Sequence, residues 1–263
     1  MALSTEQKEQ ICSLLRRTLG KKLEKYSRES KSMPFLLKLL QDKEQIAAYS
    51  FIHSIATTLG MSLYEQISVI LAEPYVEECN RNVKVGGTLS ENQIVVISSI
   101  VNGLREKIRK PSIELETKEV LGAPSVNGKF KKDGNVADFF MRKNEVEFYF
   151  EIKTVKPNID VFTDSKTKLL EWIARKQKEI KVFLAFPYNP YAPEPYSRFT
   201  EQNMMDHPND FLIAEEYWDF LGGEGAYSDL LELFDVIGKE FKEKIQAKIR
   251  EVAEQKIEVR QNI

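Results

Sequence analysis

Residues 135–158, NVADFFMRKNEVEFYFEIKTVKPN, constrain the fold more than any other part of the chain. Successive side chains of a β-strand point to opposite faces, so a run in which every second residue is apolar predicts a half-buried strand. Residues 146–153 have this alternation, and Glu151 and Lys153 belong to the polar set. The pattern therefore places the Glu151 carboxylate and the Lys153 ammonium group on one face.

The residues before this strand predict its partner. Lys143 and Asn144 separate two β-prone runs and suit a tight turn. We expect residues 135–141 to run antiparallel to 146–153, which would bring Asp138 close to Glu151. Taken alone, the pattern is also consistent with an amphipathic edge hairpin that carries ordinary surface charges.

Two carboxylates beside an ammonium group suit phosphodiester hydrolysis. Mg²⁺ prefers oxygen ligands and binds through one or two carboxylates plus substrate phosphate. A bound metal ion activates water and offsets charge on the phosphate, and a lysine can orient the nucleophile. With two cysteines and two histidines in the whole chain, a zinc site is disfavoured. We predict that Asp138, Glu151 and Lys153 are catalytic, with the two acids binding Mg²⁺, or Mn²⁺ in its place.

Asp138 and the run Glu151-Ile152-Lys153 resemble the PD-(D/E)xK motif of a nuclease superfamily, with Ala137 where proline is usual. Four longer segments resemble type II restriction endonucleases of the TdeIII family. These segments are GMSLYEQI at 60–67, FEIKTVKPN at 150–158, SKTKLLEWIARK at 165–176 and AFPYNPY at 185–191. The resemblance implies a bacterial or archaeal homodimer that uses Mg²⁺ to cut double-stranded DNA at a palindromic site of the GGNCC type.

Two other functions remain open at this point. One is a structure-specific repair or junction nuclease of the same superfamily, which would cut forks or flaps. The other is a DNA-binding module without catalysis. Cutting at discrete sites in unmodified DNA would favour the restriction enzyme, and a lack of any metal-dependent turnover would favour the binding module.

Glu65 has two interpretations. The run Ser62-Leu63-Tyr64-Glu65 has the S-x-x-E spacing of a capping box, in which the glutamate reaches back to the start of a helix. Many nucleases of the superfamily that the chain resembles take a third acid from an early helix. Glu65 is therefore also a candidate metal ligand.

The remaining patterns predict an α/β fold with a mixed central sheet flanked by helices. Apolar residues at helical spacing predict a helix at about 5–26 and a long C-terminal helix at about 228–255. Pro34 suits the first turn of a helix that Gly60 would end, which predicts a helix at 34–59. The S-x-x-Q spacing of Ser90 and Gln93 predicts a capping box that begins a helix ending near 109. A helix beginning at Thr163 or Asp164 and ending near 179 is followed by a buried strand at 181–186, which predicts a strand–helix–strand crossover. The apolar stripe of the C-terminal helix can pack on the domain or form a dimer contact.

We expect a single restriction-endonuclease-like domain over residues 1–263. Its expected parts are a mostly helical part at 1–110, the catalytic sheet and recognition loop at 120–200, and an acidic segment with the C-terminal helix at 201–263.

The candidate DNA contacts lie in four places. They are the loop at 122–134, the end of the catalytic strand, the following helix, and the proline-rich loop at 187–200, where arginine and asparagine side chains suit the reading of base edges. The residues are Lys129, Lys132, Lys156, Asn158, Lys166, Arg175, Asn189, Tyr191 and Arg198. The alternative for both loops is an ordinary solvated surface.

Charge and cysteine content agree with this interpretation. The net charge is −2, but residues 201–236 contain acids and no lysine or arginine, so the rest of the chain is net basic. Phosphate binding needs only a local basic patch. Two cysteines, with no signal peptide or long apolar run, predict a cytoplasmic protein without a membrane segment.

Overall fold

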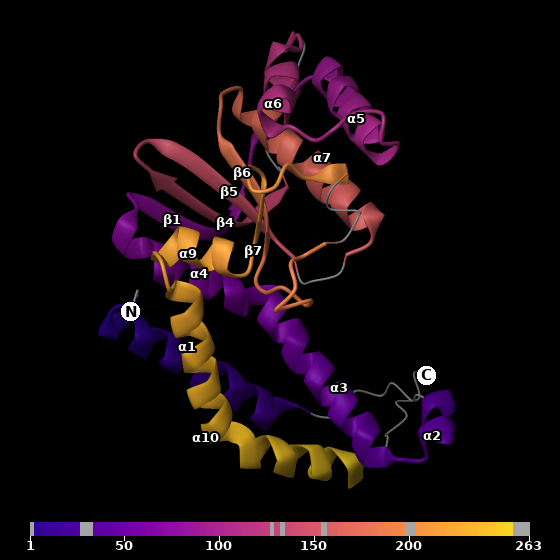
Figure 1. Cartoon of the computed structure of the whole chain (residues 1–263), viewed down its shortest axis with the longest axis vertical. Helices are drawn as coiled ribbons and strands as arrows, with labels where there is room; N and C mark the ends of the chain where they lie inside the picture. The colour runs from indigo at the N-terminus through magenta and orange to yellow at the C-terminus, as the bar shows by residue number, and fades with distance from the viewer. Residues whose placement is uncertain are drawn as a thin grey trace. The chain divides into compact units, whose positions relative to one another are not determined.

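The computed structural model describes residues 3–26, 34–126, 129–131, 135–153, 157–197 and 203–254 (Figure 1). These residues form two compact units. A helical unit contains residues 3–63 and 228–254, and a second unit, Tyr64–Tyr227, is built around a β-sheet. The helical unit thus combines residues from both ends of the chain, whereas the parts expected from the sequence, 1–110 and 201–263, were separate.

The sheet has five strands in the order β1-β4-β5-β6-β7. β1, β4 and β5 pair antiparallel, and β6 and β7 continue parallel to β5. The sheet is therefore mixed, and the predicted α/β fold class is confirmed. The bounds are Glu78–Lys84 for β1, Val136–Lys143 for β4, Val146–Ile152 for β5, Lys181–Phe186 for β6 and Phe211–Ile213 for β7.

Helices cover both faces of the central strand β5. On one face the Tyr149 ring lies 6.1 Å from that of Trp172 in α7, which spans Ile159–Lys176. On the other face Phe150 lies 5.8 Å from Tyr217 in α9, which spans Glu215–Gly222. Alternating residues of a strand point to opposite faces, so aromatic packing on both sides buries the second half of β5, while Val146 at its start is exposed. The prediction of a half-buried strand was therefore wrong for residues 149–152 only, which are buried on both faces.

The other helices of this unit lie on the same two faces. α5 and α6 pack against α7, and α4 packs against α9 and the first two strands of the sheet (Figure 1). Their bounds are Tyr64–Ala72 for α4, Glu91–Arg105 for α5 and Ile113–Gly122 for α6, and a 3-10 turn spans Glu73–Tyr75. The predicted capping box at the start of α5 is confirmed, because the Ser90 hydroxyl accepts from Gln93 N and the Gln93 side chain accepts from Ser90 N.

A two-stranded ribbon includes part of the predicted loop at 122–134. β2, Gly87–Leu89, pairs antiparallel with β3, Lys129–Lys131. Runs of three residues show no readable alternation, so the sequence did not indicate either strand. The ribbon packs beside α7.

Gly87 allows this close packing. Its φ is +143°, and a Cβ atom built on it would lie 2.0 Å from the carbonyl oxygen of Arg175. We therefore expect Gly87→Ala to lower the free energy of unfolding by roughly 1–3 kcal/mol, measured by urea denaturation. Gly20→Ala in α1 is the control, because no atom beyond its chain neighbours and the backbone of its own helix lies within 4 Å of its Cβ position. Equal stability of the two variants would contradict this account.

The helical unit contains α1, α2, α3, a π-helical turn and most of α10. Their bounds are Thr5–Lys25 for α1, Pro34–Leu40 for α2, Lys43–Thr58 for α3, Leu59–Leu63 for the π-helical turn and Ala226–Glu254 for α10. The predicted continuous helix at 34–59 is broken. Gln41 adopts a positive φ of 51°, and the Asp42 side chain caps α3 by accepting from Gln45 N at 3.0 Å.

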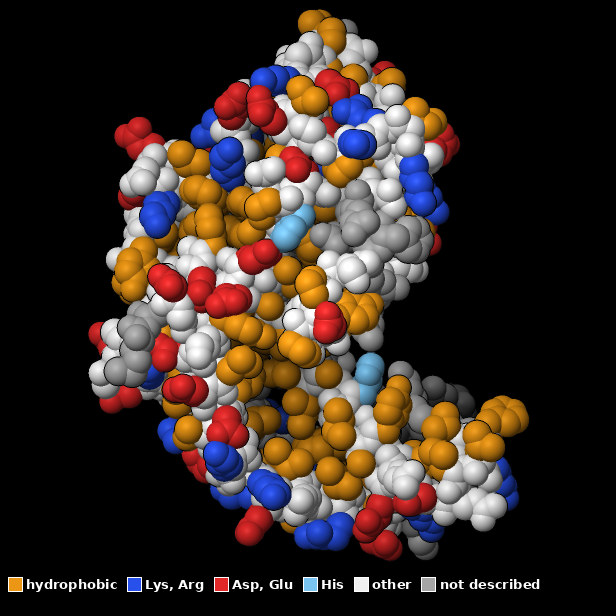
Figure 2. Space-filling model, in the orientation of Figure 1, with side chains coloured by type: hydrophobic (Ala, Val, Ile, Leu, Met, Phe, Trp, Pro, Cys, Tyr) orange, Lys and Arg blue, Asp and Glu red, His pale blue; other side chains and the backbone are white. Residues whose placement is uncertain are grey.

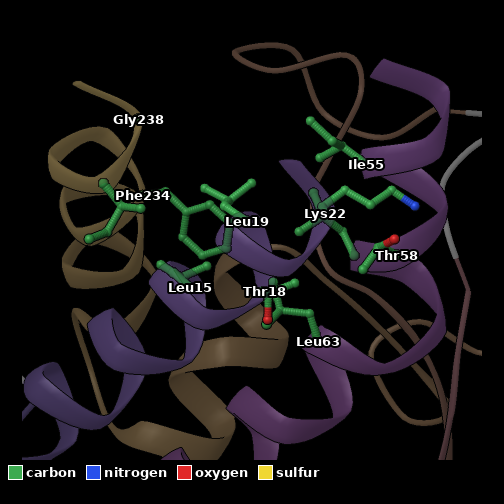
Figure 3. A pocket seen from close by; sticks show the side chains of 11 residues that line it. Leu15, Thr18, Leu19, Lys22, Ile55, Thr58, Leu63, Phe234 and Gly238 are labelled. Atoms are coloured by element: carbon green, nitrogen blue, oxygen red, sulfur yellow. The ribbon is translucent and has the colours of Figure 1, made fainter. Parts of the chain in front are cut away.

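An apolar cavity of about 150 Å³ lies within the helical unit (Figure 3). Side chains of α1, α3 and α10 line it, among them Leu15, Ile55 and Phe234. Lys22 is the one charged residue of the lining. The cavity therefore offers shape and apolar contact, but no group suited to the predicted chemistry.

Among the helices that the structure describes, none has the length and apolar character needed to cross a membrane.

Candidate active site

The antiparallel hairpin of β4 and β5 carries the three predicted catalytic residues. Phe139 pairs with Phe150, so Asp138 and Glu151 are the next residues toward the open end of the hairpin. The backbone N–H of Ile152 donates to Asp138 Oδ2 at 2.7 Å. The predicted hairpin is confirmed, although its turn is formed by Asn144 and Glu145, which both have positive φ.

Asp138, which is partly buried, and Glu151, which is buried, form an acidic pair. Glu151 is 2% exposed. Burial raises the pKa of Asp138, and the negative charge of Glu151 raises it further. A carboxylate whose ionisation is disfavoured by burial and by a neighbouring carboxylate needs a positive charge close by, from an ammonium group or a metal ion.

Lys153 provides one of these charges. Its Nζ lies 2.5 Å from Glu151 Oε1, and its side chain is 39% exposed. Burial works against the charge of Lys153, but the charge of Glu151 outweighs this effect and raises the pKa of Lys153. The ammonium group therefore stays charged and can face both Glu151 and solvent.

A second lysine at this site was not predicted. Lys168 of α7 contacts Glu151 Oε2, and its Nζ lies 5.3 Å from the centre of the Trp172 ring. Lys168 is not among the candidate site residues that the sequence indicated. Residues four apart lie on the same face of a helix, so Lys168 shares a face with the apolar Trp172. This spacing was the sequence signal that could have placed Lys168 toward the sheet.

Glu65 does not have the capping role that its spacing suggested. The π-helical turn Leu59–Leu63 continues directly into α4, so no helix begins at Ser62. Glu65 Oε2 instead accepts from Asn82 Nδ2 at 3.0 Å and lies 3.9 Å from an Arg81 nitrogen. Burial and then the charge of Asp138 raise the pKa of Glu65. Glu65 therefore lies within the electrostatic range of Asp138.

Two of the candidate DNA contacts are internal. Lys166 is completely buried, with its Nζ 2.5 Å from both Glu116 and Asp210 carboxylates. Arg175 is 5% exposed and lies 3.0 Å from Glu171. A phosphate group cannot approach a side chain that is enclosed by protein. Full burial therefore contradicts the prediction that Lys166 contacts DNA. The burial of Arg175 likewise contradicts its predicted contact with DNA.

Other candidates take part in local structure. The Asn158 side chain caps α7 by accepting from Val161 N at 3.0 Å. Asn189 accepts from Tyr191 N at 2.9 Å and donates to the Glu194 carbonyl at 2.8 Å, so it shapes the proline-rich loop. The Tyr191 ring lies 5.6 Å from that of Tyr196. Lys132, Lys156 and Arg198, and the side chain of Lys129, lie outside the described residues.

The donor atoms at the site fit magnesium. Asp138 and Glu151 supply carboxylate oxygens, and Mg²⁺ is commonly held by two protein carboxylates with water and phosphate completing its coordination. Within the described ranges no three acidic, histidine or cysteine residues form a group that could hold a metal ion together. The arrangement is therefore a two-carboxylate site, with Glu65 nearby.

Comparison with known families identifies the class of protein. A family model described as "Type II restriction endonuclease, HinfI" matches residues 3–238. Together with the α/β fold and the acidic hairpin, this match defines a type II restriction endonuclease, a class of DNA-binding hydrolases. Specifically, the chain belongs to the HinfI family. The class predicted from the sequence is confirmed, and the matching family is HinfI where the sequence resemblance had indicated TdeIII.

Individual restriction enzymes are similar over most of the chain. Type II restriction enzyme MjaII of Methanocaldococcus jannaschii is 31% identical over 210 residues, which cover 73% of this chain and 55% of MjaII. HgiEI of Herpetosiphon aurantiacus is 26% identical over 196 residues, which cover 72% of this chain and 71% of HgiEI. The chain thus spans little more than half of MjaII. No solved structure matches at a significant level.

Proposed function

We propose that this chain hydrolyses phosphodiester bonds of double-stranded DNA at a short palindromic site, with Mg²⁺ or Mn²⁺ held by Asp138 and Glu151. The observation that supports this most strongly is the pair of partly buried Asp138 and buried Glu151, with the ammonium group of Lys153 at 2.5 Å from Glu151. Enzymes of the matching class cut DNA. The metal ion would supply an activated water and positive charge beside the phosphate.

The residues of the chain then have separate tasks. Asp138 and Glu151 hold the metal ion, and the hydrogen bond from Ile152 N fixes one oxygen of Asp138. Lys153 orients the attacking water and offsets charge on the phosphate. Glu65 adds a third carboxylate, directly or through water. Its raised pKa fits this task, because a dication close to Asp138 would favour the ionised form of both acids.

For the recognised sequence we propose a site of the GGNCC type. The support is the resemblance of the four segments at 60–67, 150–158, 165–176 and 185–191 to TdeIII-type enzymes. Tyr191 and Arg198 of the proline-rich loop are the proposed base readers, and Asn189 holds the loop in shape. Lys129, Lys132 and Lys156 are proposed to contact phosphates, and Asn158 to set the start of α7.

Digestion of a long unmethylated DNA tests this function. With Mg²⁺ we expect discrete fragments, and sequencing of their ends should show one palindromic site. Addition of a chelator should stop the reaction. Cutting confined to forks or flaps would instead support a structure-specific nuclease, and a lack of metal-dependent cutting on every DNA would overturn the proposal.

We also propose that the enzyme acts as a homodimer, because a two-fold symmetric DNA site is matched by two copies that each cut one strand. Exposed apolar side chains in the helical unit support this. Phe35 and Leu39 of α2 are 90% and 81% exposed, and Tyr49 and Ile52 of α3 are 55% and 58% exposed. Figure 2 shows apolar side chains at the surface over α2. Such patches commonly mark protein interfaces.

Light scattering after size-exclusion chromatography tests the dimer without DNA. The chain has a mass of 30.4 kDa, so the wild type should elute with about twice that mass. The double variant Leu39→Glu/Ile52→Glu should shift to the monomer mass. Val95→Glu changes a 67% exposed residue of α5 and should leave the dimer intact. A wild-type monomer at micromolar concentration would contradict the proposal.

A further inference from the structure

Two lysines of α7 contact two glutamates of β5. Lys168 contacts Glu151 Oε2, and Lys176 lies 3.2 Å from Glu147 Oε2. Each lysine also lies over an aromatic ring, with 5.3 Å from Lys168 Nζ to the Trp172 centre and 5.7 Å from Lys176 Nζ to the Tyr149 centre. The two pairs have similar surroundings, but only Glu151 belongs to the proposed metal site.

Both oxygens of Glu151 are occupied by ammonium groups. Lys153 lies 2.5 Å from Oε1, and Lys168 contacts Oε2. Together with Asp138 the cluster contains two carboxylates and two lysines. A metal ion that binds Glu151 must therefore displace at least one ammonium group, since a dication and an ammonium group at one oxygen repel each other.

Of the two lysines, Lys168 can move away from Glu151 more easily. Lys153 belongs to the same strand end as Glu151, so it stays beside the carboxylate whenever β5 is formed. Lys168 reaches Glu151 from a separate helix through a flexible four-carbon chain that is 20% exposed. Rotation of that chain would carry its ammonium group away from Glu151 and toward solvent without moving the backbone.

We propose that Lys168 is a second active-site lysine that occupies Glu151 Oε2 until the divalent ion binds, and that its displaced ammonium group then faces a phosphate of the bound DNA. This inference rests on the proposed function. If the inference is right, Lys168 has two opposing effects. It lowers the affinity for the metal ion in the absence of DNA, and it raises the rate of the cleavage step. A residue that merely supported the fold would not have this combination.

Metal binding in the absence of DNA tests the first effect. Calorimetric titration of Mn²⁺ into full-length Lys168→Met should give an affinity roughly tenfold higher than the wild type, since one competing positive charge has been removed. Lys176→Met is the matched control, on the same helix with the same kind of partner, and should leave the affinity unchanged. A lower or unchanged affinity in Lys168→Met would overturn the inference.

Cleavage at saturating Mg²⁺ tests the second effect. The single-turnover rate should fall roughly 10–100-fold in Lys168→Met, recover in part in Lys168→Arg, and stay at the wild-type value in Lys176→Met. Circular dichroism confirms that each variant is folded. Equal rates for the two methionine variants would overturn the inference while the proposed function stands. A wild type without metal-dependent cleavage would instead overturn the proposed function.

Discussion

Replacement of Lys153 by alanine should lower the single-turnover rate of DNA cleavage by roughly 10²–10³-fold and leave DNA binding nearly unchanged. The ammonium group lies 2.5 Å from Glu151 Oε1, at the same strand end as the acidic pair of Asp138 and Glu151. Asp138→Asn should have a loss of similar size. It keeps the shape of the side chain and its acceptor oxygen for Ile152 N, but removes the charge that holds the metal ion.

The control for this prediction is Lys178→Ala. Lys178 is 53% exposed and lies 2.9 Å from Glu147, which belongs to the same strand as Glu151. Its removal should change the cleavage rate by no more than about twofold, because exposed ion pairs contribute little. DNA binding is measured by fluorescence anisotropy without divalent metal. Cleavage by Lys153→Ala at the wild-type rate would exclude this lysine from catalysis.

The hairpin was predictable because its information is local. Alternation with a period of two places Glu151 and Lys153 on one face, and a short turn brings Asp138 to the same end. Lys168 was not predictable in this way, since its contact with Glu151 depends on how α7 crosses over the sheet. A crossover can be expected from strand–helix–strand order, but the rotation of its helix is set by tertiary packing.

The missed strands have a similar explanation. β1, with the sequence ECNRNVK, is polar and largely exposed, and its sequence shows no apolar alternation. It is an edge strand that pairs with β4 through its backbone, which leaves no trace in a hydrophobic pattern. β7 has three residues, all buried. Such a short apolar run does not distinguish a strand from part of a helix.

Glu65 shows that spacing can predict the wrong partner. A capping box needs a helix that begins at Ser62, but the helical backbone arrives there from α3 through the π-helical turn Leu59–Leu63. The S-x-x-E spacing alone contains no information on the preceding backbone. With the capping role removed, Glu65 is bound by Asn82 and influenced by Asp138, which strengthens its candidacy for the active site.

Lys166→Met should lower the free energy of unfolding by about 3–5 kcal/mol, because it leaves two buried carboxylates without their positive partner. Lys166, Glu116 and Asp210 are all completely buried. Burial works against the charge of Lys166, but Asp210 and Glu116 outweigh it and raise the pKa of Lys166. Urea denaturation, followed by circular dichroism, measures the loss.

Two further variants test whether the loss of stability comes from the buried, unpaired carboxylates or merely from the loss of one lysine charge. Lys118→Met breaks an exposed pair with Glu114 and should leave the free energy of unfolding nearly unchanged, because solvent screens the pair. The triple variant Lys166→Met/Glu116→Gln/Asp210→Asn should regain much of the stability lost in Lys166→Met, because the amide groups remove the buried charges and keep acceptors for Ser112 N and Asp206 N. Equal stability of Lys166→Met and Lys118→Met would show that the buried lysine does not hold α6 and the start of β7 against α7.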